Sequence, residues 1–167
     1  MIIVIPIIII IIVYILIEYN IIIKKVNSVK HSKSVVEVYL SQRFDLIPNL
    51  IECVKEYTQY EERIFDKITL LRTEYIKDKV LQKGGLLDAE INKTLLVLES
   101  YPELKASEQF INLQKNLTKM ENQIQAARRI FNIEVEKYNN NISIFPNSII
   151  ALIFKLEKEG FFKMEEE

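Results

Sequence analysis

The N-terminal segment MIIVIPIIIIIIVYILIEYNIII constrains this chain most, because it consists almost entirely of apolar residues. Residues 1–17 carry no charged side chain, and residues 18–23 add only Glu18 and Asn20 as strongly polar residues. About 20 helical residues cross the hydrocarbon core of a bilayer. A helix packed on a soluble core would show a polar face, which this segment lacks. The sequence therefore predicts a transmembrane anchor at residues 1–23, which contacts the lipid bilayer through residues 2–23.

The charges beside this segment predict its orientation. Four lysines follow the span within ten residues, without an acidic residue among them: Lys24, Lys25, Lys30 and Lys33. Positive flanks stay on the cytoplasmic side, so we expect a single-pass protein of the cell (inner) membrane. Its short N-terminus would lie outside and the bulk of the chain in the cytoplasm. A cleaved signal peptide would need a basic segment before the apolar run and a small-residue cleavage site after it, and neither is found.

The remaining residues have the pattern of long helices. Only three glycines and four prolines interrupt the 167 residues, and apolar residues recur at steps of three and four. The sequence therefore predicts an all-α fold, in which the anchor continues into an antiparallel bundle of about four long helices. The bundle is predicted to occupy residues 24–155, and residues 156–167 form a charged C-terminal tail. The net charge of −1 gives no reason to expect a nucleic-acid partner.

Capping residues and breakers predict where the first two helices of the bundle end. The first is expected to leave the membrane and to turn back at residues 43–45, where Asp45 would cap the second helix. The second helix is expected over residues 46–78. The inward seam of the first helix is predicted at Tyr19, Ile22, Val26, Val29, Lys33, Val36 and Leu40. That of the second is predicted at Ile47, Leu50, Val54, Tyr57, Glu61, Ile64, Ile68, Leu71 and Tyr75, and a third helix is expected to place Ile91, Leu95 and Leu98 inward. The sequence then predicts its clearest loop at residues 82–85, which include two consecutive glycines.

Two more helices are predicted after this loop. Asp88 would cap the third, which ends at Tyr101 before a proline, and Ser107 would cap the fourth. The inward positions expected for the fourth helix are Phe110, Leu113, Leu117, Met120, Ile124, Ala127, Phe131, Val135, Tyr138, Ile142 and Phe145. The three asparagines at 139–141 are expected to weaken its end. A short apolar segment, residues 149–154, follows.

Two charged residues interrupt otherwise apolar helix seams. Lys33 and Glu61 lie at equal distances from Ile47, so they would face each other if the first two helices formed a hairpin with its turn near 45–48. We hypothesise that they pair. Arg128 or Arg129 is the alternative partner for Glu61.

The residues that usually carry chemistry are scarce. His31 is the only histidine and lies among lysines, so it is expected to be a solvated surface residue. Cys53 is the only cysteine and is expected to be a small buried hydrophobic residue. The acidic pair at 61–62 is expected to be solvated or structural. We therefore predict no catalytic, cofactor-binding or metal-binding residues, no small-molecule substrate and no enzymatic activity.

The most polar stretch of the fourth helix is the best candidate for a functional face. Glu121 and Arg128 are seven residues apart and share one face. A structural ion-pair network with Glu61 or Glu62 is one interpretation, and a partner-binding face is the other.

Several motifs occur in an order and spacing that resemble the bacterial LemA family over nearly the whole chain. They are RFDLIPNLIE at 43–52, YPELKA at 101–106, ENQI at 121–124, ARR at 127–129, Tyr138-Asn139 and FPN at 145–147. The resemblance implies an N-terminal transmembrane helix and a cytoplasmic bundle of long antiparallel helices. It implies no reaction. The chain departs from the family pattern at Lys33, where tryptophan is usual, and at Gln42, where a basic residue is usual.

Two classes of function remain open. The first is a membrane-anchored interaction or scaffold module at the inner face of the bacterial membrane, whose partners are other membrane or envelope proteins. The second is an envelope-maintenance accessory of a membrane enzyme such as a protease. The end of the fourth helix and residues 149–154 are the candidate contact surface. The alternative for this segment is a cap that folds back on the bundle or rests on the lipid.

Overall fold

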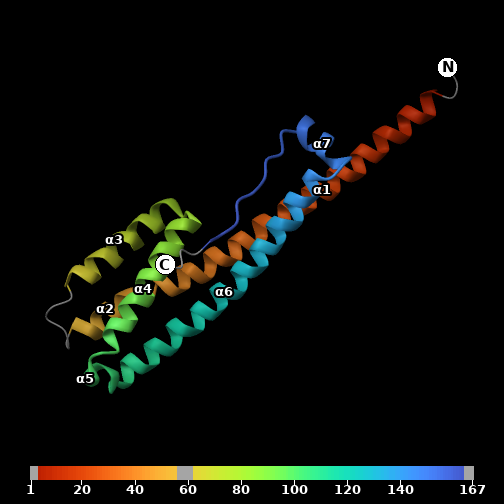
Figure 1. The fold of residues 1–167 in the computed structure, drawn as a ribbon. Helices are drawn as coiled ribbons and strands as arrows, with labels where there is room; N and C mark the ends of the chain where they lie inside the picture. The colour runs from red at the N-terminus through yellow and green to blue at the C-terminus, as the bar shows by residue number, and fades with distance from the viewer. Residues whose placement is uncertain (1–3, 56–61, 164–167) are drawn as a thin grey trace. The chain divides into compact units, whose positions relative to one another are not determined.

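The computed structural model describes residues 4–55 and 62–163, and this part of the chain is helical with no β-strand. Figure 1 shows the helices, whose bounds are α1 Val4–Phe44, α2 Ile47–Lys55, α3 Glu62–Asp78, α4 Leu81–Leu98, α5 Pro102–Lys105, α6 Glu108–Ser143 and α7 Asn147–Ile153. The predicted all-α class is confirmed. The chain divides into two compact units, which we call the anchor unit (Met1–Ser34 and Arg129–Phe161) and the core unit (Val35–Arg128 and Phe162–Glu167).

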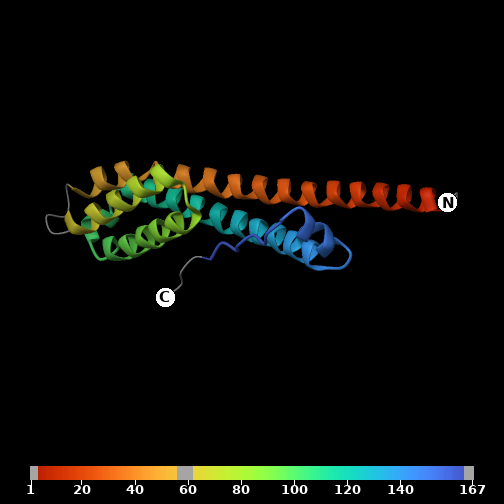
Figure 2. The ribbon, with the colours of Figure 1, turned by 90° about the horizontal axis from the view of Figure 1, so that it is seen from above.

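The anchor unit combines the first part of α1 with the last part of α6 and with α7. The two long segments run side by side in opposite directions in both views (Figures 1 and 2). Ile22 and Val29 of α1 are buried, as are Phe131, Val135 and Ile142 of α6, which lie at the predicted inward positions. Phe145 does not follow this pattern and is 76% exposed, because α6 ends at Ser143 and the helical period no longer applies.

The end of the anchor unit is fastened to α6 by polar contacts. Tyr138 Oη donates to the carbonyl of Glu157 at 2.8 Å. The Asn139 side chain donates to the carbonyl of Glu159 at 2.8 Å and accepts from its N–H at 2.9 Å. This reciprocal pair imitates the backbone pairing of a strand. The asparagines expected to weaken the helix therefore include one that holds residues 157–159 against it.

The chain reversal predicted at residues 43–45 is wrong. Only two residues separate α1 from α2, and the helical path from Val4 to Lys55 counts as one stretch of 52 residues. Pro48 explains the interruption, since it has no N–H to donate to the carbonyl of Phe44 one turn earlier. Arg72 Nε of α3 takes this place and donates to the Phe44 carbonyl at 3.1 Å. Asp45, predicted as an N-cap, instead lies 3.6 Å from Arg72 Nη2.

This continuity removes the geometric basis for a Lys33–Glu61 pair. Without a hairpin turn near 45–48, equal distance from that turn no longer predicts contact. Glu61 itself lies outside the described residues, so its partner remains untested. The single helix predicted over residues 46–78 is wrong, because Arg72 Nε lies 3.1 Å from the Phe44 carbonyl. One straight helix would separate residues 44 and 72 by about 40 Å.

The loop predicted at residues 82–85 is also wrong, because these residues lie inside α4. The turn comes earlier, at Lys79, whose φ of 48° is left-handed. Both glycines are buried where the core unit leaves no room for a side chain. A Cβ on Gly84 would lie 2.8 Å from Leu40 Cδ1 and 3.0 Å from the Tyr75 ring. The glycines therefore permit close packing in this helix.

Apolar residues at the predicted seam positions form the interior of the core unit. The buried residues common to the prediction and the structure are Val36, Leu40, Ile47, Leu50, Val54, Ile68, Tyr75, Ile91, Leu98, Phe110, Leu113, Leu117, Ile124 and Ala127. Leu71, Leu95 and Met120, which were also predicted to lie inward, are half-buried. The ring of Phe44 packs edge-on against that of Tyr75, with the ring centroids 4.9 Å apart. The spacing of apolar residues thus predicted the interior correctly even where the turns were misplaced.

Candidate functional site

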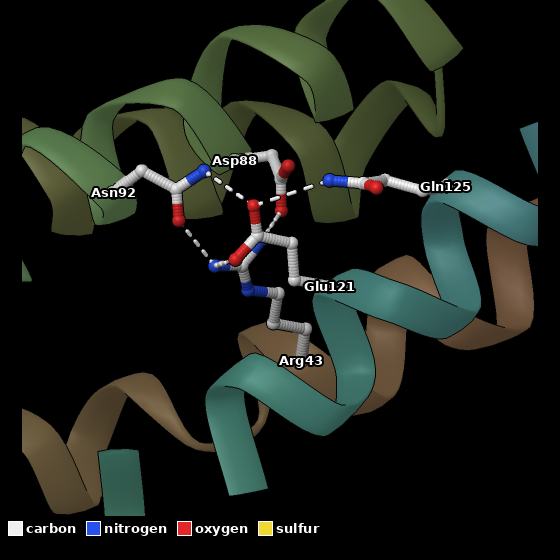
Figure 3. A network of polar contacts seen from close by, with 5 residues as sticks. All are labelled: Arg43, Asp88, Asn92, Glu121 and Gln125. Atoms are coloured by element: carbon white, nitrogen blue, oxygen red, sulfur yellow. Dashed lines mark hydrogen bonds and ion pairs between the residues drawn. The ribbon is translucent and has the colours of Figure 1, made fainter. Parts of the chain in front are cut away.

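A cluster of polar side chains lies inside the otherwise apolar core unit (Figure 3). Its centre is Arg43, the largest side chain in the described part of the chain that is fully buried. Figure 3 shows Arg43 rising from the end of α1 towards Asp88 and Asn92 of α4, and Glu121 and Gln125 approaching from α6. We call these five residues the Arg43 cluster. Its members come from three helices that are far apart in sequence.

Hydrogen bonds and ion pairs connect the cluster. Arg43 Nη1 donates to Asp88 Oδ1 in an ion pair whose side chains are both fully buried. Arg43 Nη2 donates to Asn92 Oδ1 at 2.5 Å and lies 3.6 Å from Glu121 Oε2. Two amide groups complete the cluster, since Asn92 Nδ2 and Gln125 Nε2 donate to Glu121 Oε1 at 3.3 and 3.4 Å. The planar guanidinium suits such multiple contacts better than a lysine ammonium would.

Burial determines the electrostatics of Asp88. Loss of solvent raises the pKa of the Asp88 carboxyl, an effect that the charges of Arg43 and Arg128 oppose and that of Glu121 reinforces. Arg43 Nε and Asp88 Oδ2 are buried without a hydrogen-bond partner in the described part of the chain. Such a pair adds little net stability, because desolvation of both charges offsets their attraction, yet removal of one partner is costly.

The sequence indicated part of this cluster. An ion-pair network that includes Glu61 or Glu62 was one of two interpretations of the face that carries Glu121 and Arg128. Glu121 does form an ion pair, but with Arg43, which was predicted to lie in a turn. Glu61 lies outside the described residues, and the side chain of Glu62 is not described. Asp88 was predicted to cap a helix, but it lies inside α4, where the buried face of the helix directs it to Arg43.

The other residues considered for chemistry lie apart from this cluster. His31 is exposed, as predicted. Cys53 is only half-buried and lines an open groove of about 600 Å³ between α2 and α6. A second open groove of about 460 Å³, between α2 and α3, is lined by Pro48 and Arg72. Among the described residues, no three His, Cys, Asp or Glu side chains are grouped so that they would hold a metal ion.

A family model and several known proteins are similar to this chain. The model of the LemA family matches residues 32–167, which include the complete core unit. This chain belongs to the LemA family. The matched residues begin after the apolar segment of α1, so they include the Arg43 cluster but not the anchor.

Relatives of the LemA-family chain differ widely in sequence. "Magnetosome protein MamQ 2" of Paramagnetospirillum magneticum is 21% identical, over 89% of this chain and 66% of its own length. "Magnetosome protein MamQ" of Magnetospirillum gryphiswaldense is also 21% identical, over 89% and 65%. "Protein LemA" of Metamycoplasma hominis is 20% identical, over 88% and 69%. The chain thus spans just under two thirds of the length of these MamQ proteins.

Proposed function

We propose that this protein is a membrane-anchored helical module without enzymatic activity, which works by contact with other proteins at the inner face of the bacterial membrane. The observation that carries the proposal is the exposure of the N-terminal part of α1. Consecutive residues there, which point in all directions around the helix, are about half exposed or more: Ile8 50%, Ile10 67%, Ile11 52% and Val13 49%. Exposure of such an apolar surface to water is unfavourable in free energy, whereas the acyl chains of lipids solvate it.

The length of this segment supports the anchoring. In the described part of the chain, one helical stretch is long and apolar enough to cross a membrane, and only 6% of its most apolar window is buried. Lys24, Lys25 and Lys30 follow it, so the positive-inside rule favours a cytoplasmic location for the core unit.

The Arg43 cluster supports a structural interior more than a catalytic one. Arg43 and Asp88 are fully buried and bind each other, so neither presents a charge to a substrate. The surface of the core unit offers apolar side chains instead, among them Leu96, which is 69% exposed, and Leu70, which is 60% exposed. An anchor that holds such a surface beside the bilayer raises its effective concentration towards membrane partners.

Site-specific photocrosslinking in native membranes tests the proposal. A photoreactive residue at Leu96 or Leu70 should give a crosslink to one defined protein, whereas the same residue at exposed Lys119 should give none. A partner that is a membrane protease would assign the module to an accessory role for that enzyme. Turnover of a small molecule by the purified chain, lost on one polar substitution, would overturn the non-enzymatic proposal.

A further inference from the structure

An apolar surface surrounds α7 in the anchor unit. Residues before, within and after this helix expose large apolar side chains, and we call the set the α7 wedge: Ile144 62%, Phe145 76%, Ile149 50%, Leu152 80%, Ile153 65% and Phe154 46%. Asn147, Ile150 and Ala151 of α7 turn inward, at 9%, 4% and 7% exposure. These three residues hold the helix on the anchor unit. The remaining apolar side chains are too many and too close together for a surface that faces only water.

The α7 wedge lies beside the transmembrane segment of α1. The ring of Phe154 packs on that of Tyr19, with centroids 4.5 Å apart and planes inclined at 38°. Tyr19 lies near the end of the apolar run and five residues before Lys24. Five residues of helix correspond to about 7.5 Å. Phe154 is therefore on the bilayer side of the first lysine by about the depth at which amphipathic helices lie in the interface, roughly 5–10 Å.

The length of the anchor leads to the same depth of Tyr19 and Phe154 in the bilayer. Residues 4–23 of α1 make about 30 Å of helix at ~1.5 Å per residue, which matches the thickness of the hydrocarbon core. A bilayer that covers this stretch also covers Tyr19 and what packs on it.

Backbone groups at both ends of α7 form hydrogen bonds within the chain. This matters in an apolar layer, where each unpaired polar group is costly. The N–H of Phe154 donates to the carbonyl of Ile150 at 3.0 Å, and that of Leu156 donates to Ala151 at 2.9 Å. The N–H of Ser148 donates to the carbonyl of Ile144 at 3.0 Å. Both ends of the short helix are thus closed by their own chain.

The charges next to the α7 wedge fit lipid headgroups. Lys155 and Lys158 follow it directly and are exposed, and Lys24 and Lys25 lie on the same side of the span. Basic residues in this position attract anionic lipid. Glu157 and Glu159 are exposed as well, so residues 155–159 carry as many acidic as basic side chains, and Lys24 and Lys25 supply the excess positive charge. An apolar surface beside a membrane span with lysines at its border has the chemistry of an interfacial lipid contact.

We propose that the α7 wedge inserts into the boundary between headgroups and acyl chains of the leaflet next to Lys24. It would form a second membrane contact that fixes the anchor unit against the bilayer. This proposal rests on the membrane anchoring proposed above.

Tryptophan fluorescence in vesicles tests the insertion, because the chain contains no tryptophan of its own. The full chain with Leu152→Trp is reconstituted into vesicles of phosphatidylcholine and phosphatidylglycerol that carry bromine on their acyl chains. We expect a blue-shifted emission and the loss of most of its intensity relative to unbrominated vesicles. Ile153→Trp, at a position 65% exposed, is a second reporter should the first variant misfold.

Two matched variants separate this proposal from the anchor. Ile10→Trp reports the span and Leu96→Trp reports the core unit, and both original residues are exposed to a similar degree, 67% and 69%. Quenching at position 10 together with aqueous exposure at 152 would overturn the wedge and leave the anchor standing. No quenching at either position would overturn both. A tryptophan at 152 that is shielded from aqueous iodide but not quenched by brominated lipid would mean that protein, such as a second copy of this chain, covers the wedge, and would also overturn the proposal.

Discussion

At the scale of single residues, Arg43 shows how a buried charge can organise a helical interior. Two helices of the core unit, α4 and α6, contribute acceptors to its guanidinium or to the amides around it. Asp88 of α4 and Glu121 of α6 both pair with the Arg43 guanidinium, so we expect the cluster to help specify which faces of α4 and α6 meet. Its role would then be in specificity rather than in net stability.

We expect Arg43→Met to destabilise the chain strongly, because it leaves the buried Asp88 carboxylate without its cation. Loss of one partner of a buried pair costs about 3–5 kcal/mol in the free energy of unfolding. Asp88→Leu added to Arg43→Met should recover part of this loss, since the double variant buries no charge. Urea unfolding of the full chain in detergent, followed by circular dichroism, measures both. Losses that simply add would show that the two residues are not coupled.

The pH dependence of the same variant provides an independent check. Burial raises the pKa of Asp88, so the folded state binds the proton more tightly than the unfolded state. The stabilisation from that proton is complete below the unfolded pKa of about 3.9 and is lost as the pH rises through the folded pKa. Arg43→Met removes the charge that opposes the rise. Its stability deficit relative to the natural chain should therefore shrink as the pH falls from about 7 towards 5.

An exposed ion pair serves as the matched control. Lys67 Nζ lies 2.7 Å from Glu90 Oε2, but the lysine side chain is 60% exposed. Lys67→Met should change the free energy of unfolding by about 1 kcal/mol or less, with little dependence on pH over the same range. A large effect there would mean that charge removal in general, and not burial, is responsible for the behaviour of Arg43→Met.

At the scale of helices, the glycines of α4 illustrate a packing requirement that single-sequence reasoning misinterprets. Alanine stabilises an exposed helix position by about 1 kcal/mol relative to glycine. At Gly84 the added Cβ would approach Leu40 and Tyr75, which are both buried. Overpacking of this kind costs about 1–3 kcal/mol. We therefore expect Gly84→Ala to lower the midpoint of thermal unfolding despite its better helix propensity.

Gly160 is the control for this prediction, because nothing lies within 4 Å of the Cβ that alanine would add there. Gly160→Ala should leave the unfolding midpoint nearly unchanged. If Gly84→Ala were as stable as the natural chain, Leu40 and Tyr75 would have room to move, and the close approach of α4 would not depend on the glycine.

Sequence periodicity predicted the helical interior well because apolar spacing reflects burial directly. Ile68, Leu117 and Val135 are all buried where the pattern placed them. The turns were predicted less well, because one residue type can have two structural roles. A glycine can lie in a loop or at a close contact between helices, and an aspartate can cap a helix or pair with a buried cation. Asp88 and Gly84 took the second role in each case, and only the three-dimensional contacts with Arg43 and Leu40 distinguish it from the first.

At the scale of the whole molecule, different observations support the interpretation of the anchor and that of the LemA-family core. The family match begins at residue 32, so it says nothing about the apolar segment. The proposal that this segment is a membrane anchor rests on its composition and its exposed side chains. The assignment of the core unit to the LemA family rests on the match itself. Their connection is covalent and helical, since α1 runs without interruption from Val4 to Phe44.

We predict that the core unit faces the cytoplasm, because Lys24, Lys25 and Lys30 follow the span without a compensating acid. A single cysteine at Lys119, in a chain that also carries Cys53→Ser, should be inaccessible to a membrane-impermeant thiol reagent in intact, washed cells. It should react fully once the membrane is permeabilised without unfolding, since Lys119 is exposed and burial cannot explain its protection. A second cysteine variant at Leu96, which is 69% exposed on α4, guards against cover by a partner at one position. Labelling of both variants in intact cells would contradict this orientation. The core unit and the lysines after the span would then lie on the outer side of the membrane.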